Sequence, residues 1–328
     1  MIKVGIELLK AKYGDGIFVT LSYEGKEFII MIDGGLPTTY KERRRNLDGP
    51  LKTKLKQLNG EGKHIDLLVM THVDMDHIGG ILTWFEQDCP SADFVKRIWL
   101  NDDVKVDDNT DLNNNANHAA SLIKILDEKG IAHESLFVAG KTIPFEWGSI
   151  YMLAPSSANH NAVAEKIAVN LDNKENNNYK TDIKALIAQD WTMDACTPEN
   201  DASMAFLLHT NDGENDLFLG DANIDTVMES ISLLKHFEKP LKCKWVKLSH
   251  HGSKNNFKPE FLELVTAENY VFSTNGDYYG HPDKEVFAQL IDKTNATLWF
   301  NYVERGREMI TEQDKVDYPN VENRIREI

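Results

Sequence analysis

The chain has 328 residues, of which 41% are hydrophobic, and this is enough to bury a sizeable core. Its formal net charge of −16 excludes the broad basic surface that coats long nucleic acid, so we do not expect extended nonspecific DNA binding. No apolar run approaches the ~20 residues that span a bilayer, and three widely spaced cysteines imply no disulfide framework. The N-terminal residues lack the cleavage site of a secretory signal. We expect a cytoplasmic protein without a membrane segment.

The first part of the chain is predicted to be an antiparallel meander. Its strand-like runs, separated by turn residues, cover 3–11, 16–23 and 27–35. The third run ends in Asp33 and a glycine turn. A helix is expected at 47–58 and a strand, IDLLVM, at 65–70. The short basic run KERRR (41–45) is interpreted as a solvated loop, and the alternative is a local contact for a phosphate-bearing substrate.

The ten residues THVDMDHIGG (71–80) hold most of the chemical information. They lie between a predicted strand and a helix-like run, and they contain His72, Asp74, Asp76 and His77. Packing does not explain this cluster, because crowded carboxylates and imidazoles repel or stay unsatisfied unless a cation holds them. Alternate residues His72 and Asp74 can face one ion, and the adjacent pair Asp76 and His77 can face a second.

The middle of the chain is predicted to alternate strands with one helix. The strands are expected at 97–101, 135–140 and 149–155, and the helix at 118–130. The segment that follows is Asn-rich, and its centre, NKENNN (173–178), has no apolar residue. We therefore expect a surface insertion at about 156–199 within a single domain spanning residues 1–328. This insertion is interpreted as a variable loop, and the alternative is a lid or a partner-binding loop.

In the second half of the chain, strand-like runs again lead to ligand-type residues. These runs cover 203–210, 216–221, 243–253 and 269–276. The second run ends at Asp221, the third contains His250 and His251 near its end, and the fourth leads to His281. Active sites in layered α/β folds collect at strand ends, so we expect these side chains to meet the THVDMDH motif in space.

Taken together, the motifs resemble those of the metallo-β-lactamase superfamily, in particular the metallo-hydrolase domain of the competence protein ComEC. Their order is GDG (14–16), IDGG (32–35), THVDMDH (71–77), NDAS (200–203), LGD (219–221), SHHGS (249–253) and YGHP (279–282). THVDMDH is similar to the HxHxDH signature, with Asp74 replacing the middle His, and it also resembles the phosphorylcholine esterases. The resemblance spans roughly residues 1–300. It implies an α/β (α+β) fold, a four-layer αββα sandwich, with a binuclear metal centre and without the membrane segments of ComEC.

The resemblance also implies the ligands of two divalent cations, Zn or Mn. These ligands are His72, Asp74, Asp76, His77, Asp221 and His251. The first two would bind one cation, the next two and His251 would bind the other, and Asp221 would bridge them. The superfamily often supplies a further His just before the strand that ends at the bridging Asp. The corresponding stretch here, ENDAS (199–203), has none, and Asn200 or Asp201 would take its place. Asp33 would orient a ligand from behind.

These residues predict a metal-dependent hydrolase, a phosphodiesterase or nuclease-type enzyme that acts on a phosphate ester or nucleotide. A metal-bridging hydroxide would be the nucleophile, and Asp76 would orient it or relay its proton. His250 or His281 would stabilise charge or protonate the leaving oxygen. Ser253 and Asn275 would contact substrate oxygens.

Two alternatives belong to other classes of function. The first is a hydrolase of another ester class, such as a lactone or thioester. The second is a degenerate metal-binding module that binds a nucleotide or a protein partner, and the missing histidine in ENDAS is its main support. Retention of Asp76 and Asp221 favours an enzyme, because the residues that hold and activate water are present.

Overall fold

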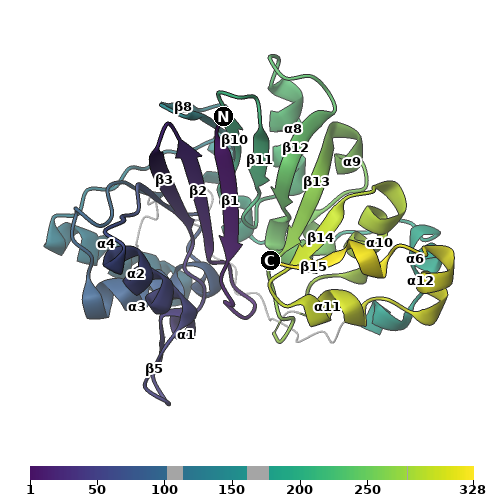
Figure 1. The fold of residues 1–328 in the computed structure, drawn as a ribbon, viewed down its shortest axis with the longest axis horizontal. Helices are drawn as coiled ribbons and strands as arrows, with labels where there is room; N and C mark the ends of the chain where they lie inside the picture. Colours follow the sequence, from purple (N-terminus) through teal and green to yellow (C-terminus); the bar gives the residue numbers. More distant parts are fainter. Residues whose placement is uncertain (102–113, 161–176, 279) are drawn as a thin grey trace.

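Alternating apolar residues along the strands build two facing β-sheets whose outer faces are covered by helices (Figure 1). The computed structural model describes residues 1–101, 114–160, 177–278 and 280–328. Within these ranges, no helix has both the length and the apolar character needed to cross a membrane. The mixed α/β architecture confirms the predicted fold class.

The first sheet holds the predicted meander and two further strands. Its strands, in spatial order, are β1 (Lys3–Leu8), β2 (Ile17–Tyr23), β3 (Lys26–Ile32), β6 (Leu67–Met70) and β7 (Ile98–Leu100). The first three pair antiparallel, as predicted, and β6 and β7 extend the sheet in parallel. Its helices are α1 (Pro37–Tyr40), α2 (Pro50–Gly60), α3 (Met75–Asp88) and α4 (Asn114–Lys129).

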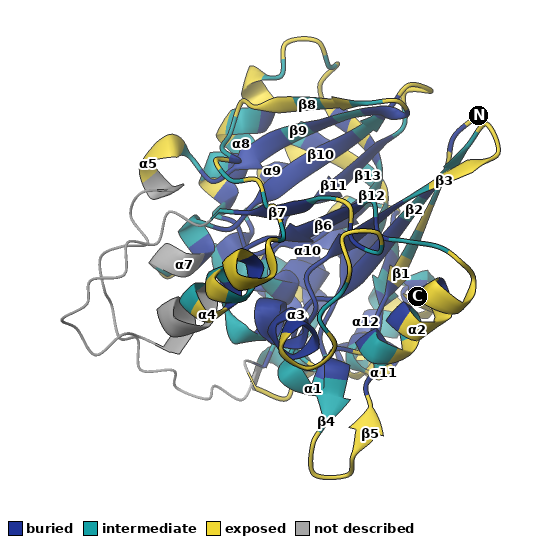
Figure 2. Ribbon diagram, turned by 90° about the vertical axis from the view of Figure 1, so that its left-hand side faces the viewer, coloured by how far each residue is buried: buried dark blue, intermediate teal, exposed yellow. Residues whose placement is uncertain are grey.

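A short hairpin projects beyond the helices of the first sheet. It consists of β4 (Lys41–Glu42) and β5 (Leu47–Asp48), and residues 43–48 are exposed (Figure 2). The basic run at 41–45 therefore lies largely in solvent. Because β5 takes up residues 47 and 48, the helix predicted at 47–58 begins only at Pro50, a residue suited to the first helical position.

The second sheet has eight strands in the order β15-β14-β13-β12-β11-β10-β9-β8. Their bounds are β8 (Thr142–Phe145), β9 (Gly148–Ala154), β10 (Ala205–Thr210), β11 (Asn215–Phe218), β12 (Leu241–Lys247), β13 (Val265–Phe272), β14 (Thr297–Phe300) and β15 (Ile325–Glu327). The strands from β8 to β11 pair antiparallel, and those from β11 to β15 pair in parallel. The strand-like runs predicted at 203–210 and 216–221 are thus confirmed as β10 and β11, which pair as a hairpin.

Helical segments of the second half surround this sheet and its loops. The α-helices are α5 (Ser157–His160), α6 (Ile183–Ile187), α7 (Pro198–Asp201), α8 (Ile224–Leu233), α9 (Phe261–Leu264), α10 (Lys284–Lys293), α11 (Val303–Glu308) and α12 (Glu312–Asp317). The 3-10 turns are η2 (Asn177–Lys180), η3 (Ser249–Gly252), η4 (Lys254–Asn256) and η5 (Glu322–Arg324).

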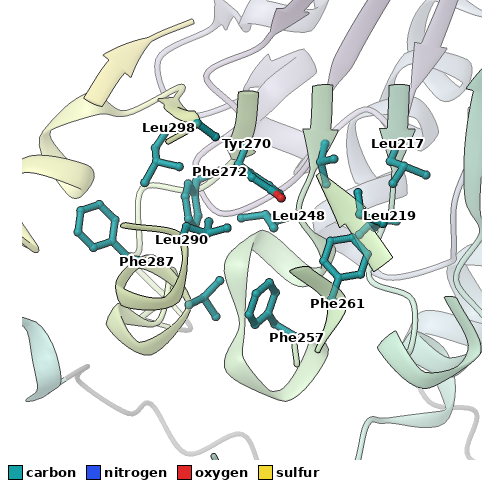
Figure 3. Packing of buried hydrophobic residues seen from close by; sticks show 14 of the residues in the cluster. Leu217, Leu219, Leu248, Phe257, Phe261, Tyr270, Phe272, Phe287, Leu290 and Leu298 are labelled. Atoms are coloured by element: carbon teal, nitrogen blue, oxygen red, sulfur yellow. The ribbon is translucent and has the colours of Figure 1, made fainter. Parts of the chain in front are cut away.

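Three hydrophobic clusters fill the three spaces between the four layers. The strand residues alternate between them: in β10, Phe206 and Leu208 lie in the cluster between the sheets, whereas Leu207 faces the helices. Figure 3 shows the outer cluster of the second sheet, where Phe261 and Phe287 from two helices pack toward strand residues such as Tyr270. The sheets are buried along most of their length, and the helices expose their outer faces (Figure 2).

One predicted strand, at 135–140, is not a strand. Leu136 has a φ of +64° and is exposed, which breaks a regular extended conformation. Phe137 is instead held by the side chain of Asn101, which accepts a 2.8 Å hydrogen bond from its N–H and donates a 2.9 Å bond to its carbonyl. The apolar character of the run comes from Phe137, which stacks on Trp99 in the core.

The later part of the predicted insertion joins the outer layer of the second sheet. Much of its Asn-rich centre lies outside the described residues. Ile183, in contrast, is fully buried, and its N–H donates a 2.7 Å hydrogen bond to Asp314. The buried Lys284 donates to the other carboxylate oxygen of Asp314 at 2.9 Å and to the carbonyl of Tyr179 at 3.2 Å. This buried ion pair ties the end of the insertion to α10 and α12.

A buried carboxylate on β11 makes stability depend on pH. Asp216 is fully buried, and one of its oxygens accepts a 3.1 Å hydrogen bond from the N–H of Trp245. Burial raises the pKa of Asp216 to about 7. The folded state therefore keeps a proton that the unfolded chain loses above about pH 4.

Asp216→Asn should remove this pH dependence. Wild-type stability should fall by about 1.4 kcal/mol per pH unit between about pH 4 and about pH 7 from this group alone, because the raised pKa favours the protonated folded state. The neutral Asn does not titrate. In urea unfolding of the two metal-free proteins, the free energy of unfolding of the variant should rise relative to that of the wild type up to about pH 7. Above this pH the two curves of unfolding free energy against pH should run parallel. Parallel curves over the whole range would show that Asp216 ionises without cost.

Candidate metal centre

The strand ends of both sheets deliver their ligand-type side chains to one place. Asp33 follows β3, the loop 71–74 follows β6, and Asp221 follows β11 by three residues. The turn η3, which holds His250 and His251, follows β12. Gly80 allows α3 to approach, since a Cβ at this position would lie 2.0 Å from the carbonyl oxygen of Gly34. The predicted gathering of the motifs is therefore seen in the structure.

Four imidazoles surround the buried carboxylate of Asp221. Its Oδ2 lies 3.8 Å from the Nε2 of His72, 3.4 Å from that of His77, 3.7 Å from that of His250 and 4.0 Å from that of His251. Two further carboxylates flank this group. Asp74 Oδ2 lies 3.6 Å from His72 Nε2, and Asp76 Oδ2 lies 3.6 Å from His251 Nε2.

Asp33 fixes the orientation of two of these imidazoles. It is fully buried, and its Oδ2 lies 2.8 Å from the Nδ1 of His77, so this nitrogen carries the proton. The hydroxyl of Thr71 donates to the same oxygen at 2.7 Å, which leaves Thr71 Oγ1 to accept from the Nδ1 of His72 at 3.0 Å. In the neutral form of each ring, the Nε2 lone pairs of His72 and His77 consequently point toward Asp221.

Hydrogen bonds at Nδ1 also orient the two histidines of the SHHGS motif, so that their Nε2 atoms face Asp221. The amide nitrogen of Asn256 donates to the carbonyl of Asp221 at 2.9 Å, so its oxygen faces the Nδ1 of His250 at 2.9 Å. The Nδ1 of His251 lies 2.8 Å from the carbonyl of Ser273. Both Nδ1 atoms thus carry protons, and in the neutral form of each ring the lone pair lies on Nε2.

The inner atoms of the centre have the properties of metal ligands. The Nε2 atoms of His72, His77 and His251 and the Oδ1 of Asp221 are buried without a hydrogen-bond partner among the described residues. Buried polar atoms are rarely left so, and lone pairs that converge on a carboxylate need a cation between them. The sets His72–His77–Asp221 and Asp76–His77–His251 each bring their ligand atoms within 4.8 Å of one another. The residues present therefore fit a divalent metal ion.

The adjacent histidines of η3 differ in charge state. Burial lowers the pKa of His250 to about 4. Burial also opposes the charged form of His251, but Asp15 and Asp221 raise the pKa of this residue to about 9. Burial likewise opposes the charged form of His77, but the charges of Asp221 and Asp33 raise the pKa of this residue well above its usual range. In the metal-free centre, protons on these rings offset part of the carboxylate charge.

The backbone of η3 is strained. His250 has φ +43° and His251 has φ +57°, in the left-handed region that non-glycine residues seldom adopt. Each such residue costs of order 1–3 kcal/mol and persists only where the surroundings enforce it. Two in succession place both rings beside Asp221. Strain of this kind is typical of functional sites.

The GDG motif supports the centre through Asp15, a residue that the sequence analysis did not single out. Asp15 is buried, forms an ion pair with the buried Lys247, and places its Oδ1 3.3 Å from the Nδ1 of His251. Its N–H donates a 3.1 Å hydrogen bond to the carbonyl of Asp76. The sequence signal for this role was the position of Asp15 within GDG, the first motif of the family resemblance.

The ENDAS stretch supports the imidazoles. The amide of Asn200 lies 3.2 Å from the Nδ1 of His250, and Ser203 Oγ lies 3.3 Å from the Nδ1 of His72. Ser203 also accepts a 3.0 Å hydrogen bond from the N–H of Asp221. Asp201 is engaged elsewhere, because it accepts from the side chain of Asn223 at 2.9 Å.

The remaining predicted residues lie at different distances from the centre. The ring of His281 is 5.0 Å from that of His250, and its Nδ1 is 3.4 Å from Asp283. Asn275 is half-buried, and its side chain donates to Asp277. Ser253 is buried, and its hydroxyl oxygen accepts from the N–H of Asn255 at the start of η4. Ser253 thus caps the start of η4, and its contact with substrate oxygens stays a prediction.

Comparison with known proteins bears on the first quarter of the chain and on the fold. Residues 15–87, which include Asp33 and the THVDMDH motif, match the family model of the metallo-beta-lactamase superfamily. No curated protein is significantly similar to the chain.

Three solved structures are similar at low identity. A possible metal-dependent hydrolase from Veillonella parvula is 12% identical, with 98% of this chain and 94% of that chain covered and a TM-score of 0.42. A diphosphatase from the PhnP family is 12% identical, with coverage of 87% and 71% and a TM-score of 0.35. A Cronobacter sakazakii metallo-beta-lactamase with a HARLDQ motif is 10% identical, with coverage of 66% and 62% and a TM-score of 0.29.

The family match and the architecture agree with each other. The matched residues hold the strand, the loop and the helix start that carry Asp33, His72, Asp76 and His77. The second sheet supplies the facing half of the centre. Residues 15–87 thus carry the metallo-beta-lactamase superfamily signature, and the chain has the metallo-beta-lactamase fold.

Proposed function

We propose that the protein is a metal-dependent phosphodiesterase that holds two divalent cations, Zn²⁺ or Mn²⁺. The observation that carries this proposal is the convergence of four imidazole Nε2 atoms on the Oδ2 of Asp221, at 3.4 to 4.0 Å. Each of these rings has an acceptor at Nδ1, as metal-bound histidines do. The mixture of imidazole and carboxylate suits both Zn²⁺ and Mn²⁺.

The ligands divide into two groups on either side of Asp221. Asp76, His77 and His251 form one group, which is supported by the 3.6 Å approach of His251 to Asp76. His72 and Asp74, also 3.6 Å apart, begin the other group. Asp221 is within 4 Å of imidazoles in both groups, so it is the proposed bridge.

His250 is the proposed replacement for the histidine that is missing from ENDAS. Its Nε2 lies 3.7 Å from Asp221, and its low pKa keeps the lone pair of this nitrogen available at neutral pH. Asn200, which lies in ENDAS, contacts its Nδ1. ENDAS therefore lies against an imidazole that another loop provides.

The proposed reaction is hydrolysis of a phosphate diester. Bound divalent cations would supply positive charge that activates water and polarises a phosphoryl oxygen. Asp76, which is almost fully buried at the start of α3, would accept or relay the proton of the attacking water. His281, whose Nδ1 faces Asp283, would deliver a proton to the leaving oxygen.

A direct test is hydrolysis of bis(p-nitrophenyl) phosphate with Zn²⁺ or Mn²⁺ supplied. We expect turnover that disappears on chelation. A double variant, Asp76→Ala with His77→Ala, should lose more than about 100-fold in rate, because it removes two ligands from one group. The matched control is Asp93→Ala with His236→Ala, which changes the same residue types at exposed positions and should keep wild-type activity.

The possible outcomes separate the alternatives. Two bound metal ions without diester hydrolysis would contradict the phosphodiesterase proposal and favour another ester class, such as a lactone or thioester. A chain that binds no metal would contradict the catalytic proposal altogether and leave a binding module.

A second test concerns the support of His72. Thr71→Val keeps the shape of the side chain but removes the hydroxyl that links Asp33 to His72. We expect metal affinity to fall about 10- to 100-fold, the usual effect of losing a hydrogen bond behind a ligand, as measured by competition with a chromophoric chelator. Thr83→Val is the control, because that buried hydroxyl bonds only to the carbonyl of Gly79 in its own helix. Equal affinity in wild type and Thr71→Val would show that this hydrogen bond does not hold His72 as a ligand.

A further inference from the structure

Two tyrosines from distant parts of the chain stack on each other near the metal centre. The rings of Tyr13 and Tyr278 are 5.2 Å apart with an angle of 22° between their planes. Tyr278 is 41% exposed, and it is the one aromatic residue among the exposed large hydrophobic residues of the described chain. Aromatic rings contribute most to stability when they are buried. This pair instead keeps aromatic surface in contact with solvent.

Hydrogen bonds between two loops hold this pair in place. The N–H of Asn275 donates to the carbonyl of Lys12 at 2.8 Å, and Ser273 Oγ donates to the carbonyl of Gly14 at 3.4 Å. The N–H of Lys12 donates to the hydroxyl of Tyr302 at 2.9 Å. The loops that follow β1 and β13 are thus joined at the edge of the sandwich where the ligands gather (Figure 1). The backbone beside the two rings is thus held by hydrogen bonds before any ligand arrives.

The same loop is in direct contact with a proposed metal ligand. A Cβ on Gly14 would lie 2.0 Å from the carbonyl oxygen of Asp76, so only glycine permits this approach. The N–H of Asp15 bonds to the same carbonyl at 3.1 Å. Tyr13 directly precedes Gly14, and the Cα atoms of the two residues are about 3.8 Å apart. Burial and the charge of Asp76 both raise the pKa of Tyr13, which agrees with their proximity.

We propose that Tyr13 and Tyr278 form a stacking platform for the base of a nucleotide whose phosphate lies at the metal centre. The proposal rests on the phosphodiesterase function and narrows the substrate to nucleotide esters. Every base has a planar face that stacks on an aromatic ring, so such a platform favours nucleotides over other phosphate esters without selecting a sequence. The exposed Lys12, on the same loop, adds positive charge beside the platform in a chain that is otherwise acidic.

The test compares two ligands that differ only in the base. Adenosine 5′-monophosphate and ribose 5-phosphate are titrated into the full chain loaded with Mn²⁺, and heats of binding give the two dissociation constants. We expect the nucleotide to bind about tenfold more tightly, as one stacked base contributes. In Tyr278→Leu and in Tyr13→Leu this ratio should fall to near one. Tyr278→Phe, which keeps the ring, should retain it.

A control variant and a parallel assay separate this proposal from the one it rests on. Tyr23→Leu changes a partly exposed tyrosine at the far end of β2 and should keep the wild-type ratio. A wild-type ratio near one would overturn the platform even if a generic diester is hydrolysed. A tenfold ratio that is lost in the leucine variants but not in Tyr278→Phe would support the platform even if no diester is hydrolysed, in which case only the proposed reaction fails. A tenfold ratio that survives in both leucine variants would also overturn the platform.

Discussion

The carboxylate of Asp221 is the group on which the arrangement of the centre depends. It is buried between the ends of two sheets, and four imidazole nitrogens face it. A buried carboxylate is costly unless it is paired, and lone pairs that point at it add to the cost. A proton or a metal cation between the carboxylate and the imidazole nitrogens turns this repulsion into attraction. Stability of this edge of the sandwich is therefore coupled to whatever positive charge occupies it, and the hydrogen bonds behind each ring hold the geometry open for that charge.

Residues whose position follows from local sequence were predictable. His72, Asp76 and His77 follow a buried strand within one turn, and Asp221 and the histidine pair follow later strands, so strand ends alone brought them together. Asp33 was predicted to orient a ligand, and the structure places it against Thr71 and His77. In each case the signal was a ligand-type side chain directly after a strand, which fixes position without knowledge of any long-range contact.

Supporting residues that act across the chain were not predictable. Lys247 and Asp15 are separated by 232 positions, and neither has a local pattern that indicates the other. Asn256 orients His250 only because the strained turn folds back on the carbonyl of Asp221. The same limit explains the error at 135–140: an apolar run predicts burial of Phe137, but its partner Asn101 decides that the backbone bonds to a side chain and not to a strand.

The missing histidine of ENDAS changes the balance between the two groups of ligands. Where the superfamily often has an imidazole, this chain has Asn200 and Ser203, which contact His250 and His72 from behind. Such contacts orient ligands but add none. In the proposed arrangement, the group that begins with His72 and Asp74 depends on His250, and the left-handed backbone that holds this ring also holds His251 of the other group. Asp33 supports both groups, directly at His77 and through Thr71 at His72, whereas Asp15 and Lys247 brace only the group of Asp76, His77 and His251. The additional ion pair of Asp15 with Lys247 on that side favours tighter binding there, so in the proposed two-metal centre the His72 side is expected to fill second.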